Sequence, residues 1–260
     1  MADPAVAIIT RTQCRPLTLD RAIRSILGQR FQDWQLTLVS DAGNLEVIKE
    51  VLSRYADGLK GRLNLLHRKT SSGMEAASNF GIANSRSRFV VLHDDDDSWH
   101  PEFLGTTVGY LRSSRTEHRG VVAGTELVFE RIEGNRILEL RRRVMPPPPR
   151  RLTAPVLRRR NVFPPIAFVY DREAGKAAGG YREDLRALGD WEFNVRFAAH
   201  FSIGQIPDIL AYWHHRPRAP GHPLAYANSP YRDHMECLMR LKREWGQWPP
   251  LWRHLLWWRY

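Results

Sequence analysis

The chain contains the sequence Phe89-Val90-Val91-Leu92-His93-Asp94-Asp95-Asp96-Asp97, an apolar run that leads directly into four aspartates. The apolar run has the length and composition of a buried strand. Open α/β sheets bind their ligands at the carboxyl ends of parallel strands. Four adjacent carboxylates repel one another, and their burial is costly unless a cation neutralises them. The sequence therefore predicts a Mg²⁺ or Mn²⁺ site that bridges to the phosphates of a nucleotide.

The residues before this stretch alternate short apolar runs with segments whose apolar residues recur at helical spacing. This alternation predicts βαβ units, and hence an α/β fold with a mostly parallel sheet flanked by helices. Residues 190–197 predict a further amphipathic helix. The predicted strands are residues 6–9, 36–39, 63–66, 89–92, 121–123, 127–129 and 137–138.

The composition fits one α/β domain with an appendage, because 260 residues with 43% hydrophobic content can bury one sizeable core. A net charge of +11 indicates an anionic partner, which nucleic acid, a nucleotide diphosphate, a membrane surface or an acidic saccharide would satisfy. Cys14 and Cys237 form neither a disulfide framework nor a metal-ligand spacing. With no visible secretory signal or membrane-spanning run, we expect a cytoplasmic enzyme.

Two basic segments stand apart from this core. Residues 141–160 place arginines around Pro146–Pro149, which predicts a loop that either closes over an anionic ligand or is simply solvated. Residues 217–260 form a basic, aromatic and partly helical extension. Its tryptophans predict docking on the domain, a dimer interface or peripheral membrane association. They are Trp245, Trp248, Trp252, Trp257 and Trp258, followed by Tyr260.

Several motifs resemble those of the family 2 glycosyltransferases of the GT-A fold. Asp94-Asp95-Asp96 matches the Asp-x-Asp motif of this family, and residues 6–12, 22–29, 39–43 and 72–83 are similar to its other segments in the same order. The resemblance covers residues 5–216. It implies a catalytic domain over residues 1–216, with a nucleotide-sugar half at about 1–100 and an acceptor half at about 101–216.

The resemblance also implies an activity. A metal-dependent inverting enzyme would move a sugar from a nucleotide-diphosphate donor, UDP-linked by expectation, to a hydroxyl of a saccharide or lipid-linked acceptor. Mn²⁺ or Mg²⁺ would be the cofactor, and the process would be surface polysaccharide or glycolipid synthesis. No nucleic-acid partner is expected, and the oligomeric state is left open.

The resemblance assigns individual roles as well. Asp190 would be the catalytic base, with Gly189 before it where a glutamate is frequent in the family. Asp41 would contact the base, with Ser40 in place of a first aspartate. Asn79, Asp94 and Asp95 would bind the nucleotide sugar, and Asp96 and His215 the metal. Separately, the position of Thr10 and Arg11 after the first strand predicts nucleotide contact.

Two other functions are weighed against this one. A nucleic-acid-binding protein would use the basic and aromatic surface, but it leaves residues 94–97 unexplained. A nucleotidyltransferase would also hold a metal near a parallel sheet. Such enzymes usually have a glycine-rich loop after the first strand, and residues 10–16 contain no glycine.

Overall fold

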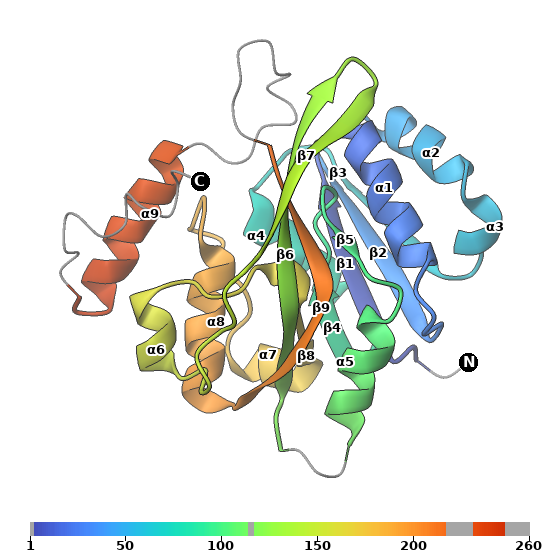
Figure 1. The fold of residues 1–260 in the computed structure, drawn as a ribbon. Coiled ribbons are helices and arrows are strands. Elements are labelled where there is room, and N and C mark those ends of the chain that lie inside the picture. The colour runs from blue at the N-terminus through green and yellow to red at the C-terminus, as the bar shows by residue number, and fades with distance from the viewer. Residues whose placement is uncertain (1–2, 114–116, 217–230, 248–260) are drawn as a thin grey trace.

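The computed structural model describes residues 3–113, 117–216 and 231–247 (Figure 1). The first part of the chain alternates strands and helices, as predicted from its sequence. Its elements are β1 (Val6–Thr12), α1 (Pro16–Leu27), β2 (Trp34–Asp41), α2 (Leu45–Ser53), α3 (Ala56–Leu59), β3 (Leu63–Arg68), α4 (Met74–Ala83) and β4 (Phe89–Leu92).

These strands form the parallel half of the sheet, in the order β3-β2-β1-β4. Each helix follows from local sequence. Pro16 starts α1, where its missing N–H costs nothing, and Leu19 and Ile23 face the core. Asn44 caps α2 through its side chain. α4 packs closely on β1 because Gly81 has no side chain. A Cβ at this position would lie 2.7 Å from Ile9 Cγ2.

The second part of the chain adds strands of both directions and the remaining helices. Its elements are β5 (Ser98–Trp99), α5 (Phe103–Arg112), β6 (Gly120–Glu133), β7 (Arg136–Val144), α6 (Ala154–Arg159), β8 (Phe168–Asp171), α7 (Arg172–Ala177), α8 (Gly189–His200), β9 (Ile203–His215) and α9 (Tyr231–Glu244).

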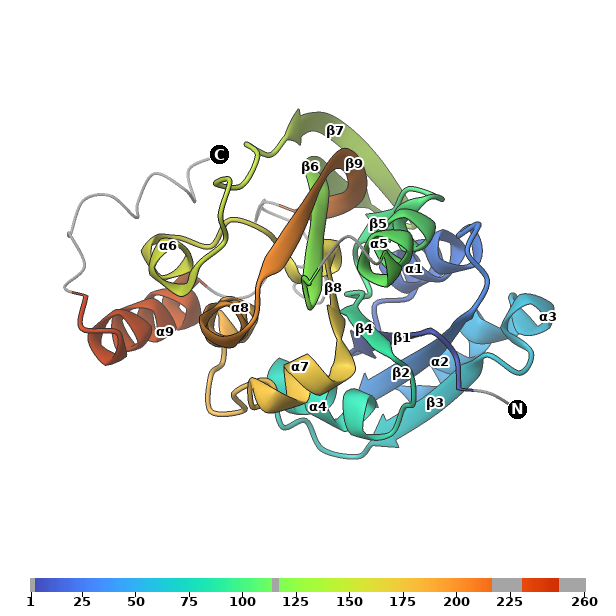
Figure 2. The same ribbon diagram turned by 90° about the horizontal axis from the view of Figure 1, so that it is seen from below.

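The described strands form one sheet in the order β3-β2-β1-β4-β8-β6-β9-β5, with β7 paired to β6. β8 runs antiparallel to both β4 and β6, whereas β6 and β9 are parallel. Figure 2 shows α1 and α5 on one side of the sheet and α4 and α7 on the other. The predicted α/β class, with a central sheet flanked by helices, is confirmed.

The structure corrects two details of the predicted second half. Residues 121–129 form one strand, with a register shift near Gly124, rather than two strands. The predicted 141–160 loop is regular at both ends, because residues 141–144 belong to β7 and residues 154–159 form α6. Arginine suits an exposed strand because its long side chain can cover apolar neighbours. Arg141 does so, with its Cζ 3.9 Å from the ring centroid of Phe129.

The extension docks on the catalytic domain where it is described. Leu241 of α9 is fully buried in a cluster with Leu185 and Ala187. Trp245 packs edge-on against Trp191 of α8, with ring centroids 5.3 Å apart. The expected docking therefore holds for α9, while Trp248, Trp252, Trp257, Trp258 and Tyr260 lie outside the described residues. Among the described residues, no helix combines the length and apolarity needed to cross a membrane.

Candidate active site

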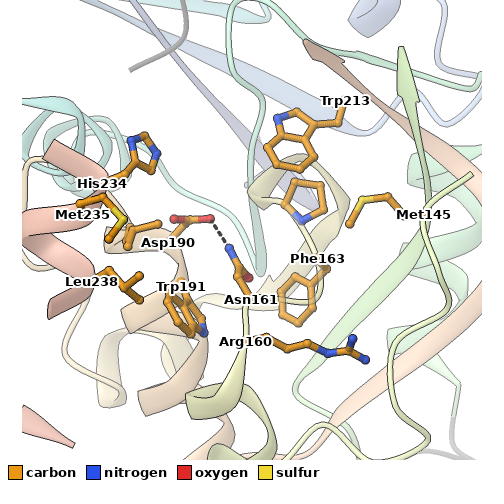
Figure 3. A pocket seen from close by; sticks show the side chains of 12 residues that line it. Met145, Arg160, Asn161, Phe163, Asp190, Trp191, Trp213, His234, Met235 and Leu238 are labelled. Carbon is orange, nitrogen blue, oxygen red and sulfur yellow. Dashed lines mark hydrogen bonds between the residues drawn. The ribbon is translucent and has the colours of Figure 1, made fainter. Parts of the chain in front are cut away.

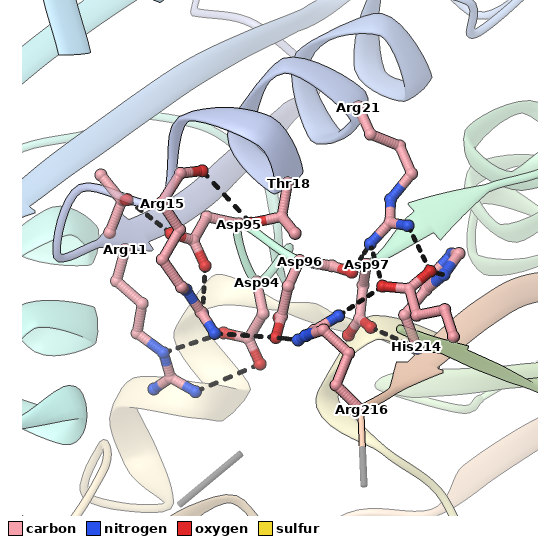
Figure 4. Close-up of polar contacts among 12 residues, drawn as sticks. Arg11, Arg15, Thr18, Arg21, Asp94, Asp95, Asp96, Asp97, His214 and Arg216 are labelled. Atoms are coloured by element: carbon pink, nitrogen blue, oxygen red, sulfur yellow. Dashed lines mark hydrogen bonds and ion pairs between the residues drawn. The ribbon is translucent and has the colours of Figure 1, made fainter. Parts of the chain in front are cut away.

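The four aspartates lie between β4 and β5, at the carboxyl end of the parallel strands, as predicted. Arg15, just before α1, pairs with Asp95 and donates from Nη1 to Asp96 Oδ2 at 2.9 Å (Figure 4). Asp96 also pairs with Arg216, which follows β9. These charge-assisted hydrogen bonds are the strong kind, and they join the start of α1 to the end of β9.

Asp94 pairs with Arg11, near the end of β1. Arg11 Nε donates to Asp94 Oδ1 at 2.9 Å, and Nη1 donates to Ser78 Oγ at 2.7 Å. Burial lowers the pKa of Arg11, but the charges of Asp94 and Glu75 outweigh burial and raise it above its usual value. The structure thus brings together two of the predicted nucleotide-binding residues.

Glu130 of β6 connects the arginines around the aspartates. Its carboxylate accepts hydrogen bonds from Arg21 Nη1 at 2.6 Å and Arg216 Nη1 at 2.5 Å, and lies 2.8 Å from His214 Nδ1. Burial raises the pKa of Glu130, but His214 and Arg21 outweigh burial and lower it to about 2. Glu130 was not predicted from the sequence, where its only signal is a carboxylate that follows the apolar run 127–129.

The structure corrects the expectation that a cation must neutralise these aspartates. Arginines pair with Asp94, Asp95 and Asp96, while Asp97 Oδ1 accepts a hydrogen bond from the backbone N of His214 at 2.9 Å. Burial raises the pKa of Asp96, but the charges of Arg15 and Arg216 outweigh it and hold the pKa below its usual range. Among the described residues, no three His, Cys, Asp or Glu side chains are grouped as metal ligands.

His215, predicted as a metal ligand, keeps one feature that a cation site requires. Its Nε2 is buried and has no hydrogen-bond partner. Burial lowers the pKa of His215 to about 4, and Asp96 is close enough to oppose that shift. The imidazole is therefore neutral at pH 7, the form that binds metals. Asp96 and His215 could supply two ligands, with phosphate and water oxygens completing the shell.

Asp41, predicted to contact the nucleotide base, is buried at the end of β2. Its Oδ2 accepts a hydrogen bond from Ser71 Oγ at 2.5 Å. Its Oδ1 has no hydrogen-bond partner, although Arg68 Nη1 lies 3.8 Å away. A buried carboxylate oxygen without a donor is costly, so this atom is suited to accept an N–H from a ligand.

The structure places three other predicted nucleotide-binding residues away from an open site. Thr10 and Asp95 are fully buried. β1 continues beyond the predicted strand, so Thr12 rather than Thr10 reaches the aspartates and donates to Asp95 Oδ2 at 2.5 Å. The amide of Asn79 is bonded to the backbone N and O of Tyr181, at 3.0 and 2.8 Å. Asn79 therefore anchors the segment before α8.

Asp190, the predicted base, lies in the first turn of α8 and lines a cavity of about 180 Å³ (Figure 3). Asn161 Nδ2 donates to Asp190 Oδ2 at 3.3 Å. Burial raises the pKa of Asp190, and the charges of Arg11 and Asp94 also act on it. The carboxylate therefore lines the cavity and lies close enough to Arg11 and Asp94 for their charges to act on it, so it can take a proton from a group bound in the cavity.

Gly189 is explained by a carboxylate from another element. A Cβ at Gly189 would lie 2.5 Å from Oε1 of Glu75, which is buried on α4. Burial raises the pKa of Glu75 to about 7, and Asp190 contributes to the same shift. Where the resemblance expects a glutamate on α8, this chain has a glycine and places the glutamate of α4 in the adjoining space.

Comparison with known proteins identifies the family. A family model described as Glycosyl transferase family 2 matches residues 6–173, more than half of the chain. The chain belongs to glycosyltransferase family 2. The expected membership of this family is thereby confirmed, and it disfavours the nucleic-acid-binding and nucleotidyltransferase alternatives.

Two relatives in this family illustrate the extent of the similarity. EpsE of Bacillus subtilis (strain 168), which bears a glycosyltransferase name, is 31% identical over 140 residues, 52% of this chain and 48% of EpsE. A PGL/p-HBAD biosynthesis glycosyltransferase of Mycobacterium tuberculosis (strain ATCC 25177 / H37Ra) is 26% identical over 198 residues, 75% of this chain and 70% of the relative. The chain thus spans about half of EpsE.

Solved structures of two other proteins share the fold of this chain. S. aureus TarS 1-349, in complex with UDP-GlcNAc, has a TM-score of 0.67 at 16% identity, covering 92% of this chain and 66% of TarS. The mannosyltransferase PcManGT of Pyrobaculum calidifontis, in complex with GDP-Man and Mn²⁺, has a TM-score of 0.56 at 17% identity. The match covers 82% of this chain and 57% of PcManGT. The predicted GT-A fold is confirmed.

The Glu130 network predicts a pH dependence of stability. The folded pKa of about 2 lies below the ordinary 4.5, so the charge of Glu130 stabilises the fold above pH 4.5. That contribution, about 3 kcal/mol, is lost as the pH falls toward 2. Between pH 5 and 2.5, the free energy of unfolding, measured with urea, should fall less in Glu130→Gln than in the parent. Glu133→Gln, exposed on the same strand, should follow the parent, and parallel curves for all three would refute the assignment.

The close approach of Gly189 and Glu75 predicts a coupled pair of substitutions. Gly189→Ala should cost about 1–3 kcal/mol of stability because the new methyl collides with the Glu75 carboxyl. In a Glu75→Ala background most of that cost should disappear, as thermal unfolding would show. Gly109→Ala, where a Cβ meets nothing within 4 Å, is the control. An equal cost in both backgrounds would contradict the packing argument.

Proposed function

We propose that the chain transfers a sugar from a nucleoside diphosphate sugar to an acceptor hydroxyl, with inversion and with Asp190 as base. The observation that carries the proposal is that Asp190 lines a cavity and also lies within range of the charges of the Arg11–Asp94 pair. A base in that position would touch the acceptor on one side and face the donor on the other. The cavity is then the acceptor side and the aspartates the donor side.

On the donor side, Asp41 and Arg11 are the proposed nucleotide contacts. The Asp41 Oδ1 that accepts no hydrogen bond would receive a ring N–H, which uracil and guanine offer and adenine and cytosine do not. Between these two, the UDP complex of TarS supports UDP as the donor nucleotide. Arg11 Nη1 is held by Ser78, and its permanent charge suits a diphosphate. Asp94, bonded to Arg11, is the proposed ribose contact.

We propose that Mn²⁺ or Mg²⁺ binds with the donor, held by Asp96 and His215. The free Nε2 of His215 supports this assignment, and PcManGT is described with Mn²⁺. Arg15 and Arg216 now occupy the Asp96 carboxylate, so they would release it to the ion. A bound ion stabilises negative charge on a leaving diphosphate.

The reaction proposed for Asp190 is a single displacement. The acceptor oxygen forms a bond to the anomeric carbon as the bond from that carbon to the diphosphate breaks. The hydroxyl proton passes to Asp190, whose orientation Asn161 fixes. Burial keeps the pKa of Asp190 above that of an ordinary carboxyl, which strengthens it as a base. The products are the inverted glycoside and the nucleoside diphosphate.

The process we propose is the synthesis of a surface polysaccharide or a glycolipid, at the cytoplasmic side of a membrane. The name of the mycobacterial relative, a PGL/p-HBAD biosynthesis glycosyltransferase, supports this direction.

The donor assignment predicts nucleotide-specific and metal-dependent stabilisation. Thermal unfolding with UDP, GDP, ADP and CDP should show the largest increase in melting temperature for UDP with Mn²⁺, because a ligand of the native state stabilises it. Asp96→Asn should lose the metal-dependent part, and Asp41→Asn the preference for UDP. Glu133→Gln, distant from both, should behave as the parent. Equal shifts with all nucleotides, with and without Mn²⁺, would refute the donor site.

The base assignment predicts a separation of binding from transfer. Asp190→Asn should bind UDP as the parent does and lose transfer by about 10²–10⁴-fold. In the parent, activity should fall on the acid side at a pH above the ordinary carboxyl range, because the raised pKa of Asp190 leaves it protonated there. The loss of transfer and the pH dependence are both measured as the release of UDP from the donor, with and without an acceptor. Parental transfer by Asp190→Asn would contradict the assignment.

A further inference from the structure

The cavity beside Asp190 has a few polar groups in a wall that is otherwise apolar. Its polar groups, Asp190 and Asn161 among them, share the wall with a larger number of apolar side chains (Figure 3). Asn161 Oδ1 is buried and has no hydrogen-bond partner, so it is free to accept one from a ligand hydroxyl. The apolar wall includes Met145, Phe163, Leu188, Trp213, Met235 and Leu238.

This wall would bind a saccharide poorly. Each sugar hydroxyl placed against methionine, leucine or phenylalanine would lose its hydrogen bonds to water and gain none from the protein. The polar lining, Asp190, Asn161, Arg160 and His234, would satisfy only those hydroxyls that lie directly against it. The group that carries such a hydroxyl would be surrounded by hydrocarbon, which favours an apolar group.

A second apolar cavity adjoins the first. It has a volume of about 350 Å³ and shares Met145 and Phe163 with the first. Pro146–Pro148 and Ile206 are among its lining, and the half-exposed Val144 lies at the same surface. Met145 and Phe163 thus line both cavities, and the wall that they form is apolar on each side.

Helix α9 supplies one wall of the first cavity, through Met235 and Leu238. Its position is fixed by contacts on other turns of the same helix: Arg240 pairs with Asp184, and Lys242 donates to the backbone oxygen of Arg159 at 3.2 Å. The extension thereby contributes to the cavity in which the proposed base lies.

We infer that the acceptor carries its reactive hydroxyl next to an extended apolar chain, which binds along Met145, Phe163 and α9. This inference rests on the proposed function, since it takes the cavity beside Asp190 as the acceptor site. The hydroxyl binds between Asp190 and Asn161, and the chain lies against the apolar wall of the first cavity. The acceptor class is an amphipathic glycolipid or alkyl-linked hydroxyl compound, and a free oligosaccharide is a poor acceptor.

The test uses glucosides that differ only in their apolar part: methyl, butyl, hexyl and octyl β-glucoside, each below its micelle concentration. Binding is followed by the fluorescence of the full chain, in which Trp191 and Trp213 line the cavity. Each pair of methylenes added to the alkyl chain should tighten binding of the glucoside by about tenfold until the apolar wall is fully covered. Met235→Gln, similar in length but polar, should flatten this dependence. Leu140→Gln, half-exposed on β7 and outside both cavities, should not.

The outcomes separate this inference from the proposed function. UDP binding, measured in the same samples, reports on the donor site alone. If UDP binds but methyl and octyl glucosides bind equally, the apolar acceptor is refuted and the proposed function stands. An equal loss of chain-length dependence in Met235→Gln and Leu140→Gln would also refute it, because the apolar chain would then lie elsewhere.

Discussion

The ion pairs between the aspartates and the arginines are the interaction on which the site depends. Four carboxylates in one turn would repel one another, and here Arg11, Arg15 and Arg216 approach them from three parts of the chain. Glu130 then balances Arg216 and Arg21. Because the partners come from β1, the start of α1, β6 and the end of β9, the network joins the parallel half of the sheet to the mixed half. The same network brings the proposed donor and acceptor sides together.

The sequence predicted the parts of this structure that depend on neighbouring residues. Apolar runs gave the strands, and the position of the aspartates after one of them gave the edge of the sheet where the site lies. It did not predict the partners of those aspartates, because Arg216 lies far away in sequence and no local pattern marks it. Strand β7 was predicted only in part, at residues 137–138, because residues 141–143 are exposed arginines with no apolar pattern and their pairing with β6 has no local signal.

The pair of Glu75 and Gly189 shows why a motif alone is a limited guide to a site. At the sequence level, Gly189 is only a departure from the family pattern. In the fold, the space that a side chain would occupy is filled by the carboxyl of Glu75, and Asp190 follows directly. Asn79, by contrast, matches the family pattern but bonds to the backbone of Tyr181. Three-dimensional proximity, rather than position in the motif, decides both roles.

The shared charges of Glu130, Arg216 and Asp96 restrict how the sequence can change. Each of the three has more than one charged partner, so loss of any one leaves the others buried with one partner fewer, at a cost of up to several kcal/mol. A lineage that replaces them one at a time would therefore pass through a destabilised protein. Descent should keep the group intact or exchange it as a unit, while the exposed arginines of β7 drift freely.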